Sequence, residues 1–210
     1  PLMQKDASGA GMVWNTPFSQ YVKSEISVGR TWVFGRNGGQ AVATRFLAGA
    51  GYAYGNSTAL PFEKHFYSGG ANSLRGWQAR AVGPGLSQMD TTFIIPNQTG
   101  DMKLEANVEY RFKMFWKVAG ALFVDAGNVW TLRDSESSGN TSLFTWSNFG
   151  KSIAVNWGAG IRLDLNFLLL RFDMGMRVHD PARTDSRWLG PGQWLRRGNY
   201  AVHFGVGYPF

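Results

Sequence analysis

Residues 102–116 read MKLEANVEYRFKMFW and alternate between apolar and polar side chains along almost their whole length. The even positions from Met102 to Trp116 are all apolar, whereas the odd positions from Lys103 to Lys113 are polar or charged. Successive side chains of a β-strand point to opposite faces of its sheet. This stretch therefore predicts a strand with one apolar face and one charged face.

The same alternation recurs in residues 153–166 and 200–210. In the second of these, Phe204, Val206, Tyr208 and Phe210 fall on one predicted face. Four further segments are bounded by turn-forming residues and bring the number of expected strands to seven: 20–35, 40–54, 118–131 and 168–179. Hairpin turns are expected at 36–39 and 166–168. The register of 20–35 is the least regular, because Arg30 shares a side with Val28 and Trp32.

The composition favours an all-β protein that contacts a membrane through strands. Aromatic residues make up 15% of the chain, Gly occurs 27 times, and charged residues make up only 17%. No apolar stretch reaches the roughly 18 to 20 residues that a spanning helix needs, whereas a spanning strand needs only about 9 to 11.

The distribution of side chains between the two faces separates a membrane barrel from a soluble sandwich. The polar face carries charges of both signs, and the apolar face ends in aromatic residues such as Tyr52, Trp116, Trp130 and Tyr208. An aqueous lumen inside and lipid with aromatic girdles outside explain this pattern. A soluble carbohydrate-binding β-sandwich remains a remote alternative.

Several other classes of function are disfavoured. The net charge is +7, but the 21 Lys and Arg residues are scattered, so no nucleic-acid partner is expected. The chain has no Cys, its three His residues (65, 179 and 203) match no metal motif, and no nucleophile elbow or phosphate loop is present. We therefore expect no enzyme activity, no cofactor and no metal. The chain lacks a basic-then-apolar leader, so any secretion signal is expected to be removed or upstream.

Two long insertions interrupt the strands, at residues 55–101 and 132–151, and both are rich in small polar residues, Gly and Pro. Loops of this length are usually functional or disordered. In bacterial barrels the long loops are extracellular and the short turns lie on the other side.

The first insertion contains FYSGGANSLRGWQARAVGPG at residues 66–85. Its Gly69-Gly70 pair followed by Leu74-Arg75-Gly76-Trp77 resembles the lumen loop of the BamA and TamA assembly family, also called the bacterial surface antigen family. That family has a Val-Arg-Gly-Phe-like tetrad, so this chain departs at the first and last positions. The segments VEYRF (108–112), FVDAGNVW (123–130) and GVGYPF (205–210) resemble later barrel strands of the family, in order.

The resemblance implies that Arg75 enters the lumen and pairs with acidic residues on the two following strands. Glu109 and Asp125 fit this role, since each falls on the inner face of its strand and neighbouring strands lie about 4.8 Å apart. The planar guanidinium can serve two carboxylates and keeps its charge. The alternative is that these are ordinary charges with other partners.

The terminal strand, expected over 199–210, resembles the C-terminal recognition signal of outer-membrane barrels. In the family this strand forms a weak seam with the first barrel strand, and opening of the seam offers an edge to an incoming client strand. Gly205, Gly207 and Pro209 would weaken pairing here.

The expected architecture is thus an antiparallel transmembrane β-barrel of which residues 1–210 form the C-terminal part. Seven strands do not close a bacterial barrel, which has an even number of strands from eight upward. The family's barrel has about sixteen strands and follows periplasmic POTRA repeats, so the resemblance implies that the first strands and these repeats are missing from this sequence. The sequence does not separate a BamA-like from a TamA-like member.

The implied function is non-enzymatic insertion of barrel proteins into, or translocation across, the bacterial outer membrane. The implied partners are outer-membrane lipids, unfolded barrel clients, the missing part of the same protein, and periplasmic or lipoprotein accessory subunits. A two-partner-type secretion pore and a passive porin remain as alternatives.

Overall fold

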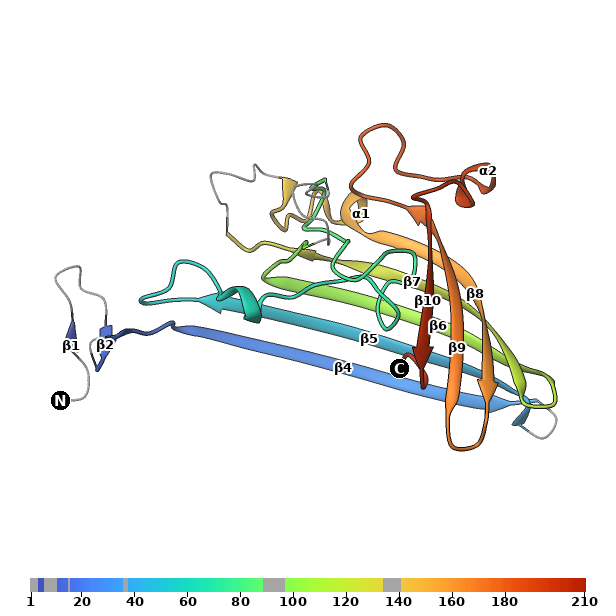
Figure 1. Cartoon of the computed structure of the whole chain (residues 1–210). Coiled ribbons are helices and arrows are strands. Elements are labelled where there is room, and N and C mark those ends of the chain that lie inside the picture. Colours follow the sequence, from blue (N-terminus) through green and yellow to red (C-terminus); the bar gives the residue numbers. More distant parts are fainter. Residues whose placement is uncertain (1–3, 6–10, 15, 36–37, 89–96, 134–140) are drawn as a thin grey trace.

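The computed structural model describes residues 4–5, 11–14, 16–35, 38–88, 97–133 and 141–210. Seven strands form one antiparallel sheet in which every strand pairs with its neighbours in the chain (Figure 1). They are β4 (Tyr21–Phe34), β5 (Gln40–Ala53), β6 (Met102–Phe115), β7 (Val118–Trp130), β8 (Ala154–Asp164), β9 (Leu169–His179) and β10 (Tyr200–Val206). All seven strands expected from the alternation are confirmed.

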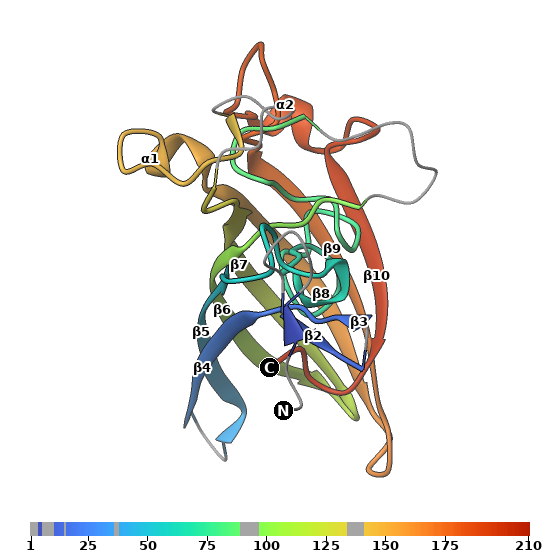
Figure 2. The ribbon, with the colours of Figure 1, turned by 90° about the vertical axis from the view of Figure 1, so that its left-hand side faces the viewer.

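The sheet curves so that one face is concave, and residues 55–88 lie against that face (Figure 2). Among the described residues, β4 and β10 are the two edges and do not pair with each other. A separate small sheet, which the sequence did not indicate, contains β1 (Gln4–Lys5), β2 (Gly11–Val13) and β3 (Thr16–Pro17).

The register follows the predicted alternation, including the strand whose pattern was least regular. The β4–β5 pairing runs without a shift from Tyr21 opposite Ala53 to Phe34 opposite Gln40. Arg30 lies on the apolar side, as the count of positions requires, and its guanidinium lies 5.2 Å from the ring of Trp32. The cation is therefore accommodated by an aromatic neighbour and does not disturb the strand.

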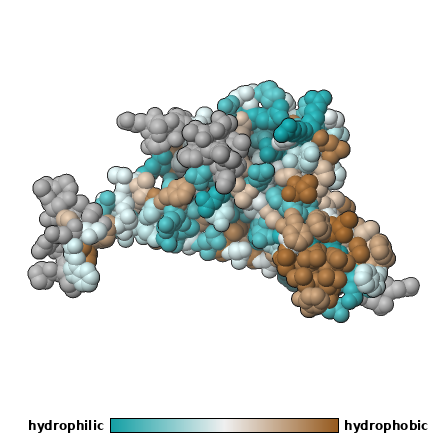
Figure 3. Space-filling model, in the orientation of Figure 1, coloured by the Kyte–Doolittle hydropathy of each residue, from teal (hydrophilic) through white to brown (hydrophobic). Residues whose placement is uncertain are grey.

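The two faces of the sheet differ as a membrane barrel requires. On the convex face, Val28, Phe172 and Phe204 are 63%, 55% and 58% exposed, and Figure 3 shows apolar side chains gathered over the lower part of β9 and β10. On the concave face, Glu105, Glu109 and Asp125 are at most 1% exposed. The apolar side chains point outward and the charges point inward, so the convex face requires an apolar environment.

One end of the sheet carries short turns and the other carries long connections. At the short-turn end, Trp116 and Lys117 join β6 to β7, and the turn after β8 closes with a hydrogen bond from the Leu165 nitrogen to the Leu168 oxygen. Of the expected hairpin at 36–39, residues 36 and 37 lie outside the described part of the chain.

Within the described residues, the helical parts of the long connections are short turns. These are η2 (Phe62–Lys64), α1 (Phe149–Ser152) and α2 (Pro191–Trp194). The connection over 180–199, between β9 and β10, is a third long segment, which was not predicted from the sequence. None of the described helices is long and apolar enough to cross a membrane.

Trp130 does not belong to the aromatic rim where the alternation placed it. The residue is 1% exposed, its ring packs at 5.6 Å from that of Phe144 and 5.8 Å from that of Phe149, and its Nε1 donates to Ser152 Oγ at 3.0 Å. The β7–β8 connection folds over the end of β7 and buries it. The expectation that this Trp faces the membrane interface was therefore wrong.

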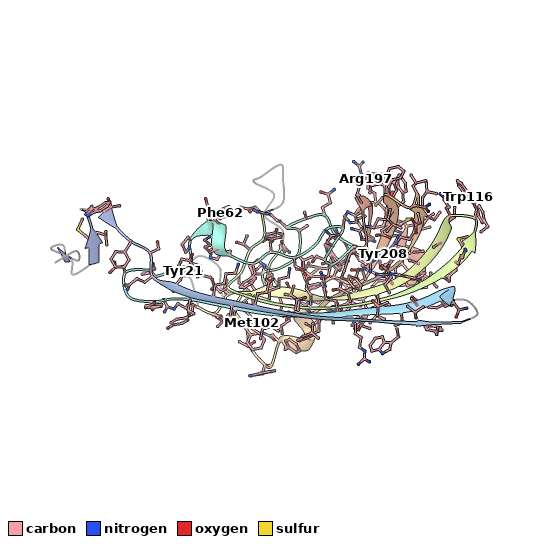
Figure 4. The ribbon with its side chains drawn as sticks, turned by 90° about the horizontal axis from the view of Figure 1, so that it is seen from below. Tyr21, Phe62, Met102, Trp116, Arg197 and Tyr208 are labelled. Carbon is pink, nitrogen blue, oxygen red and sulfur yellow. The ribbon has the colours of Figure 1, made fainter. Side chains whose placement is uncertain are left out.

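The end of the chain also departs from the predicted alternation. Strand β10 stops at Val206, and Gly207 adopts a left-handed φ of +81° that turns the last residues inward. The Tyr208 ring then lies 4.1 Å from the Arg111 guanidinium, and the Phe210 ring lies 5.2 Å from the Arg45 guanidinium. Both cations project from the concave face, where Figure 4 shows Tyr208 on the inner side of the sheet. Tyr208 and Phe210 therefore do not continue the outward face of Phe204 and Val206.

Candidate functional site

The segment Gly69–Trp77 forms a compact loop against the concave face, and the glycine pair sets its shape. Gly69 and Gly70 have φ angles of +99° and +100°, which residues with a side chain rarely adopt. The Gly70 nitrogen donates to the Trp77 oxygen at 3.0 Å, and the Gly69 nitrogen donates to Ser73 Oγ at 3.0 Å. These bonds close the loop and place Arg75 at its tip.

Arg75 is fully buried and contacts both acidic residues proposed from the sequence. Its Nε and Nη2 donate to the two carboxylate oxygens of Asp125 at 3.0 and 2.9 Å, and its backbone nitrogen donates to the same group at 3.2 Å. Its Nη1 forms an ion pair with Glu109. The guanidinium therefore bridges β6 and β7, with a two-point fork on the Asp125 carboxylate.

An aromatic ring and a histidine complete the cradle of Arg75. The guanidinium lies 3.5 Å from the ring centroid of Phe123 on β7, a close cation–π contact. His203 on β10 donates from Nε2 to the Arg75 carbonyl oxygen at 3.2 Å. Strand β7 therefore contacts the side chain of Arg75, and strand β10 contacts its backbone.

The two carboxylates that hold Arg75 are themselves held by further polar side chains. Asp125 accepts hydrogen bonds from Asn107 Nδ2 at 2.9 Å and from Asn156 Nδ2 at 3.0 Å. Glu109 accepts from Arg111 Nε at 2.8 Å and from Arg162 Nη2 at 3.1 Å. Several donors offset the burial of each carboxylate and fix its orientation.

A third carboxylate, Asp173 on β9, extends the network. It forms ion pairs with Arg162 and, at 3.2 Å, with Arg171, and its Oδ2 lies 3.9 Å from Arg75 Nη1. The side chains of Asp173, Arg162 and Arg171 are each at most 2% exposed. The charged cluster therefore spans β6 to β9 on the concave face.

Two glycines permit the loop to approach the sheet closely. A Cβ added at Gly76 would lie 2.6 Å from the Cβ of Asn156, and one added at Gly175 on β9 would collide with the Arg75 carbonyl. Arg177 donates from Nε to the Gly76 oxygen at 3.1 Å. The loop backbone consequently lies directly on β8 and β9, at a distance that larger residues would prevent.

An apolar cluster anchors the loop beside the charges. Leu74 and Trp77 are buried and pack with Val82 and Ala154. The guanidinium of Arg177 lies 5.0 Å from the Trp77 ring. The first and last positions of the tetrad, where this chain departs from the family pattern, thus both serve as buried packing residues.

Further contacts tie the start of the loop to the sheet. Ser68 Oγ donates to Glu105 at 2.6 Å, and Ser73 also donates to that carboxylate. Arg45 on β5 donates to the Asn72 carbonyl at 2.8 Å, and Arg171 on β9 donates to the Ala71 carbonyl at 3.0 Å. The loop therefore contacts every strand from β5 to β10.

The electrostatics of the site favour a permanent positive charge at the loop tip. Burial alone lowers the pKa of Arg75, but the hydrogen bonds and negative charges of Asp125 and Glu109 outweigh it, so the pKa is raised above its usual value. The guanidinium therefore remains charged at every physiological pH. Among the described residues, no group of three or more His, Asp or Glu is arranged to hold a metal ion.

The structure places the sequence-derived site residues in three groups. Gly69, Gly70 and the tetrad come together with Glu109 and Asp125 around the loop. Phe204 and Val206 lie on the convex face and do not touch the loop, whereas the Phe210 ring lies 5.8 Å from the Arg75 guanidinium and Tyr208 packs on Arg111 of β6.

Several residues of the site were not identified from the sequence: Asn107, Phe123, Asn156, Arg162, Arg171, Asp173, Gly175, Arg177 and His203. Most fall on the predicted polar face of their strands, which was the only available signal. Which of them meet Arg75 depends on the register between strands, and a single sequence does not contain that information.

Comparison with known proteins identifies the family. The model of the Omp85 superfamily domain matches residues 17–210, which include the whole sheet and the loop. This chain belongs to the Omp85 superfamily. The outer membrane assembly factor BamA of Neisseria meningitidis serogroup B is 28% identical to it over 151 residues, which cover 61% of this chain and 19% of that protein.

A solved structure supports the same fold. BamA from Haemophilus ducreyi lacking POTRA domains 1–3 superposes with a TM-score of 0.62 at 15% identity, over 94% of this chain and 37% of that chain. The chain thus spans well under half the length of either relative. The Omp85 chain is accordingly an integral protein of the bacterial outer membrane and forms part of an antiparallel transmembrane β-barrel, and the soluble-sandwich alternative is excluded.

Proposed function

We propose that this Omp85 chain forms the C-terminal barrel wall of a factor that inserts β-barrel proteins into the bacterial outer membrane. The observation that carries the proposal is the docked loop: Arg75 makes a two-point contact with Asp125 and an ion pair with Glu109 inside a fully buried network. Both relatives described above are BamA proteins, which favours assembly over the export of a single passenger.

The docked loop would give the factor a rigid wall beside a less constrained edge. The loop contacts strands β5 to β10, so the curvature of this part of the sheet is fixed from the inside. Strand β10 contains only seven residues, compared with 14 in each of β4, β5 and β6, and its described pairing is with β9 alone. A short strand at a seam whose other partner lies outside this sequence would offer an edge to an incoming strand when the seam opens.

In this mechanism the client strand would add to the exposed backbone of β10 while its apolar side chains reach lipid. No covalent step, nucleotide or cofactor is required, so the proposed activity is non-enzymatic. The partners would be outer-membrane lipids, unfolded barrel clients, the POTRA repeats and remaining barrel strands of the same protein, and accessory periplasmic or lipoprotein subunits.

Depletion of the full-length protein tests this function. We expect the amounts of many outer-membrane barrel proteins, measured by quantitative mass spectrometry of isolated outer membranes, to fall together, and to recover when the wild-type protein is restored. Outer-membrane lipoproteins, which contain no barrel, provide the control. Unchanged barrel levels would exclude the assembly function, and loss of one secreted protein alone would indicate a secretion pore instead.

A further inference from the structure

A second feature of the concave face lies at the short-turn end of the sheet, next to the loop-docking network, with which it shares Arg111 and Arg162. A groove of about 640 Å³ opens there, lined by residues of β4 to β9 and the turns between them. Four basic side chains and one acidic side chain line it: Arg111, Lys113, Lys117, Arg162 and Asp164. Basic side chains therefore outnumber acidic ones in the lining.

The register explains how the basic residues come together. Lys113 on β6 pairs with Ala119 on β7, and Ala119 pairs with Arg162 on β8, so the three residues form one row across the sheet. Neighbouring strands lie about 4.8 Å apart, which places the backbone positions of Lys113 and Arg162 about 10 Å apart on either side of a small residue. The small side chain of Ala119 thus lies between two basic residues.

The positive charge of the groove is only partly neutralised. Glu109 accepts from both Arg111 and Arg162, but no described carboxylate forms an ion pair with Lys113 or Lys117. The Lys117 ammonium has the ring of Trp116 at 5.8 Å. The Nε of Arg162 is buried and has no hydrogen-bond partner among the described residues. Asp164, the one acid of the lining, already accepts from the Asn166 nitrogen at 2.9 Å.

We propose that this groove, here called the basic groove, binds an acidic polypeptide segment. The class of ligand follows from charge and from position. Lipid contacts the convex face, whereas the groove lies on the concave face and opens beside the short turns, so an anion reaches it from the aqueous side. The lining extends from β4 to β9, so a polypeptide with several carboxylates can occupy its length and contact both Lys113 and Lys117.

This inference goes beyond the proposed assembly function and does not depend on it, because it requires only an aqueous concave face. The test is the binding of a fluorescent tetraglutamate peptide to the purified full-length protein in detergent, followed by anisotropy. Wild-type protein should bind tetraglutamate more tightly than tetraglutamine, and binding should weaken as salt rises.

The double substitution Lys113→Gln with Lys117→Gln should weaken tetraglutamate binding about fivefold, since exposed ion pairs are individually weak. Lys64→Gln is the matched control, because Lys64 is exposed in η2 near the long connections and lies outside the groove. Ala119→Glu should also weaken binding by supplying an internal carboxylate, whereas Ala119→Gln, with the same size, should weaken it less.

Three outcomes would overturn the proposal. The first is equal binding of tetraglutamate and tetraglutamine. The second is an equal loss in the Lys64→Gln control and in the double variant. The third is displacement of the peptide by inorganic phosphate at the same concentration of charge, which would indicate a site for small anions. Far-UV circular dichroism establishes that each variant is folded.

Discussion

Burial of the Arg75 charge requires several compensating contacts. The side chain is removed from water by the loop and the sheet, and this desolvation is offset only because Asp125, Glu109 and the face of Phe123 all contact the guanidinium. Replacing a buried ion network by well-packed apolar residues often costs little stability, but here it would remove the feature that selects a single docked geometry for the loop. The role of the network is therefore better described as orientation than as stabilisation.

Arg75→Ala should release the loop and leave two buried carboxylates without their main partner. We expect a loss of about 3–5 kcal/mol in the free energy of unfolding, because removing one partner of a buried pair strands the other. Urea unfolding in detergent measures this loss, and proteolysis of residues 66–85 reports whether the loop is released.

Arg80→Ala is the control for that measurement. Arg80 lies three residues after that loop, and among the described residues its side chain contacts the ring of Tyr67 at 4.7 Å and Asn97 at 3.4 Å and no carboxylate. Its replacement should cost about 1 kcal/mol or less. Equal effects of the two substitutions would contradict the central role of Arg75.

At the scale of elements, the strands pair with each other and also leave space for the loop and the side chains that pack on them. Gly175 in β9 and Gly205 in β10 weaken a strand in isolation. Here a Cβ at Gly175 would meet the Arg75 carbonyl, and one at Gly205 would lie 2.5 Å from Arg171 Nε. Glycine is present at both positions because another group occupies the space above the strand.

Gly175→Ala should therefore displace the loop although the strand itself would favour Ala. We expect destabilisation of about 1–3 kcal/mol, the usual cost of overpacking, together with faster proteolysis of the loop. Gly150→Ala in α1 provides the matched control, since nothing lies within 4 Å of the added Cβ there. A neutral or stabilising Gly175→Ala substitution would show that the loop does not approach β9 as described.

The elements were largely predictable from the sequence, because the period-two alternation is a local property of each segment. The alternation in residues 102–116 predicted the strand and the character of both of its faces. The turn at Gly207 was not predictable, since a Gly in an alternating run is equally compatible with an extended or a left-handed conformation. The burial of Trp130 depends on a connection that returns over it, which is likewise not encoded locally.

The site was predictable only in part, for a related reason. Arg75, Glu109 and Asp125 were identified because a motif resemblance directed attention to them. Arg162 and Asp173 lie on the expected polar faces, but their contact with Glu109 and Arg75 arises from the pairing of β7 with β8 and of β8 with β9. Such contacts between distant segments emerge only when the register of the whole sheet is known.

At the scale of the whole molecule, the sheet separates lipid on its convex face from an aqueous lumen on its concave face. The loop, the charged network and the basic groove all lie on the concave face, and the exposed apolar side chains lie on the other. This division explains why 44% of the residues are hydrophobic although few large apolar side chains are fully buried.

Adjacent cysteines on one strand test this division most directly, and the 210 residues contain no cysteine of their own. Ser27 and Val28 are neighbours in β4, both are exposed, and they point to opposite faces. Each would be replaced by Cys in the full-length protein in bilayers, spin-labelled, and its collision rates with oxygen and with a water-soluble nickel complex measured. We predict that the label at position 28 collides mainly with oxygen and the label at position 27 mainly with nickel. Equal accessibility of both labels to nickel, or the reverse assignment, would contradict the account.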